Sequence, residues 1–468
     1  MAEAPTALPP VKRRNAELVM TLFAIAITLF AMIEAGLTRN GEMPPDLFFL
    51  YAGLFGGLAL LAHVFIRFFA PWSDPLLLPL AVLLNGLGIA MLWRLFEATG
   101  DTERGSASNQ LVLTALSMAV FAGVVFFLKD PRKLQRYPYI MAVGAILLLL
   151  LPLLPDPIGR TVNGARQWLN VGFTALQPSE FAKIALIIFL SGYMVAKRDA
   201  LSLVNRQVKV GPVKILGLPR LRDTAPMAFM WGFCIIVLVG LMNDLGTALL
   251  LFGTFLAMVY VATQRASWLV LGLVPFFAAC YLLYFVVSHF AVRVDTWLHP
   301  FAPGIIDGPI GANSEQLVRG LFAMAQGGVL GTGLGGGQPG FVPEVQNDFI
   351  FSAFGEELGL TGVMTMLLVL ALLVERGLRT ALASQELFVK MCASGLSFLL
   401  GFQTFVVIGG VTRVIPLTGA TIPFVAKGGS ALLSSWIILA LLVRMSNNAR
   451  KPAPRAIQDE GATQVISR

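Results

Sequence analysis

The chain has 468 residues, of which 56% are hydrophobic and 13% are charged, and its mean hydropathy is +0.77. Soluble globular domains carry about 25% charged residues, so this composition excludes an ordinary soluble protein and predicts one that crosses a membrane many times. The net charge of +8 does not indicate nucleic-acid binding, because the basic residues are spread among short loops and form no stripe with aromatic side chains. The three cysteines lie in apolar runs without paired spacing, which predicts packing residues and no disulfide framework.

Apolar runs recur along the chain, and each is long enough, or nearly so, to cross a hydrocarbon core of about 30 Å as a helix. The strands of a membrane barrel would instead alternate polar and apolar residues. We therefore predict an all-α polytopic membrane protein with about twelve transmembrane helices. Their approximate positions are 18–36, 47–66, 76–93, 110–128, 138–154, 181–196, 226–242, 245–263, 267–289, 349–374, 388–410 and 431–446.

The basic residues predict the orientation of these helices. If the N-terminus is cytoplasmic, most of the 34 Lys and Arg fall in cytoplasmic segments, as the positive-inside rule requires. Both termini are then cytoplasmic in a multi-pass protein of the cytoplasmic membrane, and the loops 155–180 and 290–348 lie outside. The basic loop between the sixth and seventh spans lies inside, where anionic membrane lipids attract it.

The first outer loop contains Arg166 and Trp168, and Gln177 precedes the next span, which carries Glu180 and Lys183 in its first turns. Residues three apart share one face of a helix, so Glu180 and Lys183 are neighbours. Ionisable groups at that depth are costly unless they face a polar cavity or each other. Functional placement is therefore one interpretation, and an internal ion pair that only fixes packing is the other.

Further acids lie at or near the outer ends of later spans. Asp244 and Asp348 each come directly before a predicted helix, where capping alone also explains an Asp. Glu356 and Glu357 lie about two turns inside the tenth span, and adjacent residues on a helix point about 100° apart. We therefore expect at most one of these glutamates to face a given cavity.

The polar loop 290–348 interrupts an otherwise apolar chain and contains Arg293 and Asp307. Asp307 precedes a glycine, so it is either a catalytic acid or a turn-forming residue. The segment 331–336 formally matches the dinucleotide pattern G-x-G-x-x-G, but no strand precedes it, and flexible turns explain it better. After the eleventh span, an irregular segment brings the cations Arg413 and Lys427 to the outer face, where they could hold phosphate.

Several of these blocks, in this order, resemble the SEDS (shape, elongation, division and sporulation) family, the RodA and FtsW type of bacterial cell-wall polymerase. The resemblance covers about residues 76–446 and is closest to actinobacterial RodA-like members. The matching blocks are 163–168, 177–180 with Lys183, 244–247, 347–351 with 355–359, and 416–419 with 428–430.

The resemblance implies a ten-helix core at 76–446 and an added N-terminal hairpin at 18–75. The basic residues predict cytoplasmic tails at 1–17 and 447–468, and the polar, proline-containing composition of the latter predicts disorder. The resemblance also implies a glycosyltransferase that polymerises lipid II on the outer membrane face together with a class B penicillin-binding transpeptidase. The catalytic Asp of the family, in the extracellular loop 290–348, corresponds to Asp307, with Asp295 as the rival acid. The Asp307-Gly308-Pro309 segment and Ala426-Lys427 depart from the usual family pattern.

Lipid II polymerisation needs a base for a sugar hydroxyl and positive charge for the leaving diphosphate. We predict Asp307 as the base, and Arg166, Lys183, Glu180, Arg293 and Arg413 as the substrate-binding residues. The supporting residues are then Trp168, Gln177, Asp244, Asp348, Glu356 and Glu357. A divalent cation, Mg²⁺ or Mn²⁺, is a candidate cofactor with unknown ligands, and no organic cofactor is implied.

Two other functions remain open from the sequence. A lipid II flippase would need a polar pathway with ionisable residues in the middle of several spans, whereas here the charges concentrate near span ends. A non-catalytic scaffold of a cell-wall synthesis complex would leave Asp307 dispensable. Similarity favours a role in elongation over division.

Overall fold

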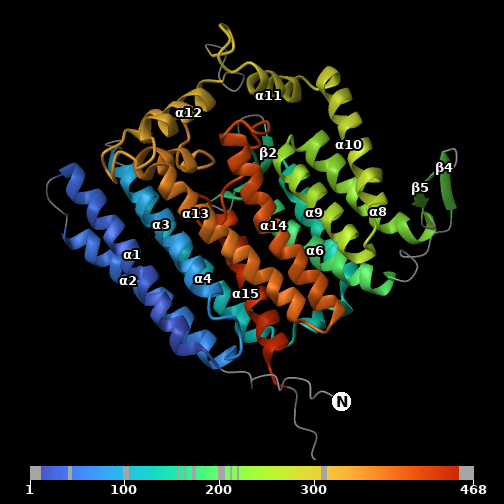
Figure 1. The fold of residues 1–468 in the computed structure, drawn as a ribbon, viewed down its shortest axis with the longest axis horizontal. Helices are drawn as coiled ribbons and strands as arrows, with labels where there is room; N and C mark the ends of the chain where they lie inside the picture. The colour runs from blue at the N-terminus through green and yellow to red at the C-terminus, as the bar shows by residue number, and fades with distance from the viewer. Residues whose placement is uncertain are drawn as a thin grey trace, which may run out of the picture.

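The protein is a bundle of long helices that run roughly alongside one another (Figure 1). The computed structural model describes residues 12–40, 45–98, 105–155, 158–162, 165–170, 175–198, 206–210, 213–218, 221–306 and 314–452. One end of the bundle carries α11 (Ser288–Leu298) and α12 (Glu315–Gly327) and is called the loop end (Figure 1). At the opposite end, called the terminal end, α1 begins at Arg14 and α15 stops at Arg450.

The long helices follow the predicted spans. They are α1 (Arg14–Asn40), α2 (Pro45–Phe69), α3 (Leu77–Ala98), α4 (Gly105–Phe127), α5 (Pro138–Leu150), α6 (Ser179–Ala196), α8 (Leu221–Ile236), α9 (Leu245–Thr263), α10 (Ser267–Val286), α13 (Ile350–Ala383), α14 (Leu387–Val411) and α15 (Gly429–Arg450). Within the described ranges, 11 helices are long and apolar enough to cross a membrane, and the shorter apolar helix Pro138–Leu153 lies at the fifth predicted position. The predicted polytopic helical fold is confirmed.

Short strands form where the sequence predicted only loops. β1 (Gly159–Val162), β2 (Ala165–Asn170) and β3 (Ala175–Leu176) make an antiparallel sheet in the order β1-β2-β3. β4 (Arg206–Val210) and β5 (Val213–Leu218) form a separate antiparallel hairpin. Strands of two to six residues leave no hydrophobic period long enough to be recognised in the sequence. These strands lie outside the helices that are long enough to span a membrane.

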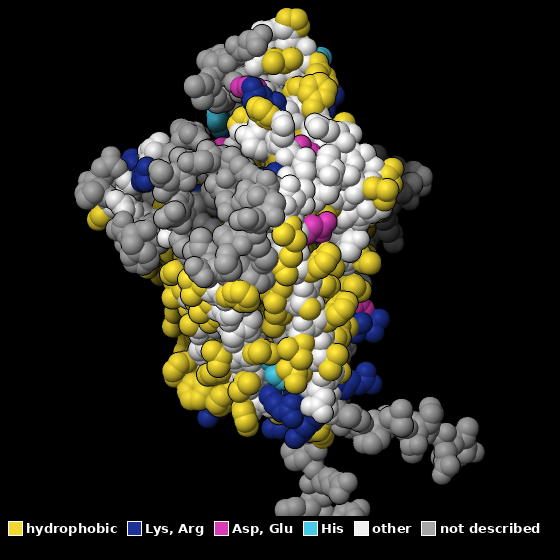
Figure 2. Space-filling model, turned by 90° about the vertical axis from the view of Figure 1, so that its left-hand side faces the viewer, with side chains coloured by type: hydrophobic (Ala, Val, Ile, Leu, Met, Phe, Trp, Pro, Cys, Tyr) yellow, Lys and Arg dark blue, Asp and Glu magenta, His cyan; other side chains and the backbone are white. Residues whose placement is uncertain are grey.

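The first two helices cover one side of the bundle. α1 packs along α3, and Gly86 of α3 permits the close approach, because a Cβ there would lie 2.0 Å from Oγ1 of Thr28. On this side of the molecule, hydrophobic side chains cover the middle, and Lys and Arg gather toward the terminal end (Figure 2). Large side chains such as Phe23 and Phe30 are exposed there. Apolar side chains of this kind are favoured where the surface of a protein contacts lipid tails.

An irregular segment between α14 and α15 descends into the bundle. The backbone carbonyl of Phe424 accepts a 3.3 Å hydrogen bond from Nδ2 of Asn85, near the middle of α3. Phe424 is fully buried with a φ of 65°, and its ring meets Trp436 edge-on. Non-helical backbone is tolerated at this depth only where protein groups satisfy it, and Asn85 does so here.

The last helix continues past the predicted boundary at 447. Oδ1 of Asn447 accepts the backbone N–H of Trp72 at 3.0 Å, and Oγ of Ser446 accepts that of Asp74 at 3.0 Å. These bonds to the α2–α3 turn hold the end of α15 in helical form as far as Arg450. Residues 1–11 and 453–468 of the predicted tails lie outside the described part of the chain.

Candidate functional site

A buried ionic cluster lies at the loop end, at the start of α6. Nζ of Lys183 donates to Oε1 of Glu180 at 2.8 Å and to Oε1 of Gln403 at 3.1 Å. Oγ of Ser434 donates to the other oxygen of Glu180 at 2.8 Å. Lys183 is 1% exposed and Glu180 is 6% exposed. The pair predicted from the sequence therefore exists, and α14 and α15 complete its coordination.

A second acid approaches this cluster from the start of α9. Asp244 caps the helix by accepting the backbone N–H of Thr247 at 3.0 Å, while its Oδ2 is buried and has no hydrogen-bond partner. Burial raises the pKa of Asp244, and the hydrogen bonds from Thr247 and the charge of Lys183 oppose this rise. Asp244 is thus both the predicted cap and a carboxylate within the electrostatic reach of Lys183.

Arg293 of α11 lies within electrostatic reach of two acids, Asp244 and Asp348. Its Nη1 donates long hydrogen bonds to the carbonyls of Leu417 and Thr418, at 3.4 and 3.3 Å. Burial lowers the pKa of Arg293, and the charges of Asp244 and Asp348 oppose this. Burial raises the pKa of Asp348 to about 6, although the Arg293 charge acts in the other direction. Arg293 therefore links α11, the α14–α15 segment and the starts of α9 and α13.

The side chains of Arg413 and Arg166, two further predicted cations, donate to backbone carbonyls. Arg413 is exposed and donates to Trp297 O at 2.9 Å and to Leu298 O at 3.0 Å. A cation is favourable at this position because α11 ends there and its last carbonyls lack helical partners. Arg166 of β2 donates from its side chain to Leu154 O at 3.0 Å and from its backbone to Met242 O at 3.1 Å. Both residues tie loop-end segments together.

Gln177 and Trp168 belong to the loop between α5 and α6. The backbone N–H of Gln177 donates to Oγ of Ser430 at 2.8 Å, and its side chain donates to Gln167 at 3.2 Å. Trp168 is half-buried in β2, opposite Arg160 of β1. These contacts join the small sheet to the start of α15, beside the Glu180 cluster.

Glu356 and Glu357 are separate from this cluster, and both hold the glycine-rich turn. Glu356 accepts the N–H of Gln338 at 2.7 Å, and Glu357 accepts that of Gly335 at 3.1 Å. Nε of Arg94 lies 3.1 Å from Oε1 of Glu357, and its Nη2 donates to the carbonyls of Gly335 and Gly337. The formal dinucleotide pattern is thus a turn clamped onto α13 by a buried ion pair.

Asp307 lies outside the described residues, which resume at Ser314. Asp295, the rival acid, accepts a 3.1 Å hydrogen bond from the Tyr284 hydroxyl. Glu315, the next acid after Asp307, forms an exposed ion pair with Arg319. Among the residues that the structure describes, no three His, Cys, Asp or Glu side chains lie together as a metal site would require.

Sequence reasoning missed three members of these clusters. Arg94 and Gln403 are single polar side chains within apolar runs, and Ser434 follows the 428–430 block by one helical turn. A polar residue in a membrane span is itself a signal of a partner within the bundle. The partners are far apart in sequence, so only the fold brings them together.

The middle of the bundle contrasts with its ends. In the described helices, Asp, Glu, Lys, Arg and His side chains lie within a few turns of one end or the other, and the central turns carry none of them. Lys183 and Glu180 lie in the first turns of α6, and Arg376 and Arg444 lie toward the terminal ends of α13 and α15. Among the described residues, charged side chains therefore gather at the two ends of the bundle and do not form a continuous path between them.

Comparison with known proteins identifies the family. A family model described as "Cell cycle protein", which covers FtsW, RodA and SpoVE, matches residues 75–451. The chain belongs to this family. The resemblance predicted for residues 76–446 is therefore confirmed.

Two curated relatives illustrate the similarity. The chain is 45% identical to the peptidoglycan glycosyltransferase RodA of Mycobacterium tuberculosis over 464 residues, which cover 96% of this chain and 94% of the relative. It is 33% identical to the probable peptidoglycan glycosyltransferase FtsW of Geobacter metallireducens, covering 81% and 95%. The higher identity is to the protein named RodA.

Two solved structures share the fold. One comes from a study of how a peptidoglycan synthase complex coordinates polymerisation and crosslinking. It is 26% identical, has a TM-score of 0.53, and covers 86% of this chain and 98% of that chain. A mutant of the rod shape determining protein RodA of Thermus thermophilus is 24% identical, has a TM-score of 0.54, and covers 81% and 99%.

Proposed function

We infer that this chain is a peptidoglycan glycosyltransferase, the activity for which its curated relatives are named. The ionic cluster at the loop end supports this end of the bundle as the place of the reaction. Buried Lys183, Glu180 and Asp244 and half-buried Arg293 lie at the starts of α6 and α9 and in α11, while the central turns of the described helices carry no Asp, Glu, Lys, Arg or His. Charged groups are retained at such depth mainly where they bind a polar substrate.

We propose lipid II as the substrate. Joining two of these molecules releases a polyprenyl diphosphate, and the developing negative charge needs a cation nearby. Arg293 is the best-placed candidate, because it is half-buried and its present hydrogen bonds, at 3.3 and 3.4 Å, are weak enough to exchange. Lys183 is 1% exposed, so we assign it a positioning role through Glu180 and Asp244.

Asp307 remains the proposed base. A carboxylate that accepts the proton of a sugar hydroxyl contributes a rate factor of about 10² to 10⁴. Inverting transfer to a hydroxyl needs one such group, whereas glycoside hydrolysis normally uses a pair. Glu315, the described acid nearest in sequence, already pairs with Arg319. Asp295, the rival acid, already accepts a hydrogen bond from the Tyr284 hydroxyl, so we assign the chemistry to Asp307.

A divalent cation is proposed to enter with the substrate. Magnesium is commonly held by one or two carboxylates together with substrate phosphates. The Oδ2 of Asp244 is a fitting protein ligand, since it is buried and accepts no hydrogen bond in the structure. When bound, the ion would supply charge neutralisation for the diphosphate.

We propose that the loop end faces outward and that both termini are cytoplasmic, as the distribution of Lys and Arg favours. We also propose a class B penicillin-binding transpeptidase as the partner. The higher identity to the protein named RodA supports a role in elongation. Depletion should then abolish rod shape before septum formation, and filamentation with normal rod width would contradict that role.

Polymerisation measured in detergent distinguishes a glycosyltransferase from a flippase. Micelles have no compartments, so transport cannot contribute to the product. Purified protein with its transpeptidase and labelled lipid II should form glycan chains, and EDTA should stop the reaction until Mg²⁺ or Mn²⁺ is restored. If folded protein formed no glycan chains with either Mg²⁺ or Mn²⁺, the proposed function would be contradicted. Full activity in EDTA would show that the reaction needs no divalent cation.

A further inference from the structure

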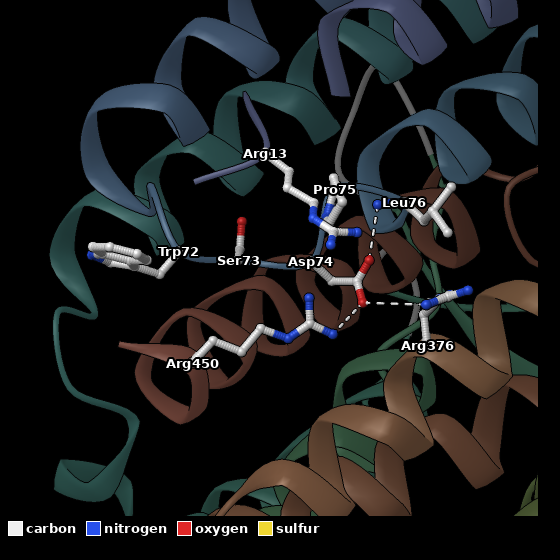
Figure 3. Close-up of a pocket in the computed structure, with 8 residues that line it drawn as sticks. All are labelled: Arg13, Trp72, Ser73, Asp74, Pro75, Leu76, Arg376 and Arg450. Carbon is white, nitrogen blue, oxygen red and sulfur yellow. Dashed lines mark hydrogen bonds and ion pairs between the residues drawn. The ribbon is translucent and has the colours of Figure 1, made fainter. Parts of the chain in front are cut away.

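A second polar site lies at the terminal end, away from the proposed reaction. It is a cavity of about 480 Å³ where the start of α1, the α2–α3 turn, α13 and α15 meet (Figure 3). Its lining residues are Arg13, Trp72, Ser73, Asp74, Pro75, Leu76, Arg376 and Arg450. Three of them are arginines from three separate segments, and only one is an acid.

Both carboxylate oxygens of Asp74, the acid that lines this cavity, already have partners. Asp74 is 1% exposed, and its Oδ1 accepts the backbone N–H of Leu76 at 2.9 Å. Its Oδ2 pairs with Arg450 and lies 4.0 Å from Nη1 of Arg376 (Figure 3). One carboxylate therefore faces three guanidinium groups, and the cavity retains an excess of positive charge.

Nearby charges do not remove this excess. Glu375 pairs with Nε of Arg376 at 3.2 Å, but it also pairs with Arg379. Arg14 is matched by Glu17, which also contacts His63. Lys12 adds further positive charge, with its Nζ 5.1 Å from the centre of the Trp72 ring.

Arg13 is the least committed of the three arginines. It is exposed, and its guanidinium points toward Asp74 and Pro75 (Figure 3). Within the described part of the chain, no side-chain hydrogen bond or ion pair of Arg13 occurs. A guanidinium offers five N–H donors in a planar fork that matches the geometry of a phosphate.

The cavity lies at the edge of the hydrophobic belt. Phe68 and Phe69, at the end of α2, are 74% and 37% exposed, and the lining residue Trp72 follows Phe69 by three positions. Lipid tails next to these rings would place their headgroups at the depth of the arginines. Basic pockets between membrane helices are known to hold anionic headgroups.

We propose that this cavity binds the phosphate headgroup of an anionic phospholipid from the adjoining leaflet. The lipid phosphate bridges Arg13, which directly precedes α1, to Arg376 of α13 and Arg450 of α15. The apolar surfaces of Trp72 and Leu76 accommodate its glycerol backbone. A bound lipid would therefore fasten the hairpin to the core, independently of the reaction at the loop end.

Lipid titration of the full-length protein in neutral detergent tests the proposal. Dioleoylphosphatidylglycerol should raise the thermal unfolding midpoint and appear as a bound adduct in native mass spectrometry, because a ligand stabilises the state that it binds. Phosphatidylcholine should give a much smaller shift. Arg13→Gln should weaken phosphatidylglycerol binding by about tenfold, with the lipid-free midpoint unchanged because this side chain has no partner among the residues that the structure describes.

A matched control is available at the same end of the molecule. Arg132 is exposed and pairs with Asp130 and Glu386, outside the cavity. Arg132→Gln should bind phosphatidylglycerol as the wild type does. Equal affinity in wild type and Arg13→Gln, or equal shifts with the two lipids, would overturn the proposal. An equal shift with inorganic phosphate at matched concentration would overturn the lipid assignment in favour of a free anion.

Discussion

Lys183 is a charged side chain that is 1% exposed in the first turns of a membrane helix, paired with Glu180 and Gln403. A buried ion pair adds little net stability, because desolvation offsets the attraction, yet breaking it leaves an uncompensated charge. Stability alone therefore does not explain why the Lys183–Glu180 pair is present. Both residues were found in the sequence, whereas Gln403 and Ser434 could not be assigned, since they come from α14 and α15.

Lys183→Met should separate the structural role of this pair from the functional one. The single variant should lose about 3 to 5 kcal/mol of stability, because Glu180 remains buried and unpaired. Glu180→Gln added to it should restore most of the thermal unfolding midpoint. Polymerisation by the double variant should stay far below the wild-type rate, since the charge near Asp244 is missing. A double variant with wild-type activity would reduce the pair to a packing element.

The pH dependence of protein stability tests the environment of Asp348. Burial raises its pKa to about 6 in the folded protein, above the ordinary value of 3.8. The ionised carboxylate therefore destabilises the fold at pH 7, and this cost is relieved as the pH falls through about 6. Asp348→Asn should be more stable than wild type at pH 7, with a difference that shrinks toward pH 5. A difference independent of pH, measured by thermal unfolding in detergent, would contradict this environment for Asp348.

At the scale of the elements, the helices were predictable and the connections were not. Long apolar runs fix the spans, because the bilayer demands about 20 such residues each. The strands β1 to β3 and the descent of the 412–428 segment depend on partners distant in sequence. Gly88 shows this: a Cβ there would lie 2.4 Å from the carbonyl oxygen of Val425. Nothing in the α3 sequence indicates that contact.

Gly88→Ala should accordingly force α3 and this segment apart. Overpacking of this kind costs about 1 to 3 kcal/mol, so the thermal unfolding midpoint should fall. Gly57→Ala in α2 is the matched control, because a Cβ there meets nothing within 4 Å. It should leave the midpoint unchanged or raise it slightly. Equal midpoints for the two variants would argue against the close packing of Gly88.

At the scale of the whole molecule, the two ends of the bundle carry different chemistry. The loop end gathers Glu180, Lys183, Asp244 and Arg293 beside the polar loop, and the terminal end gathers arginines around Asp74. The sequence revealed the first end through motifs, and the orientation that its basic residues predict stays a prediction. It could not reveal the arginine cavity, whose lining comes from residues 13 to 450, nor the clamp between Arg94 and Glu357.

The central claim is that this chain polymerises glycan strands at its loop end with Asp307 as the base. The most direct test is the rate of glycan chain formation from labelled lipid II by Asp307→Ala and by Glu315→Ala, each purified with the transpeptidase. Glu315 lies in the same loop but pairs with Arg319, so its variant should retain activity. The account predicts loss of about 10² to 10⁴-fold for Asp307→Ala alone. Chain formation by folded Asp307→Ala at the wild-type rate would contradict it.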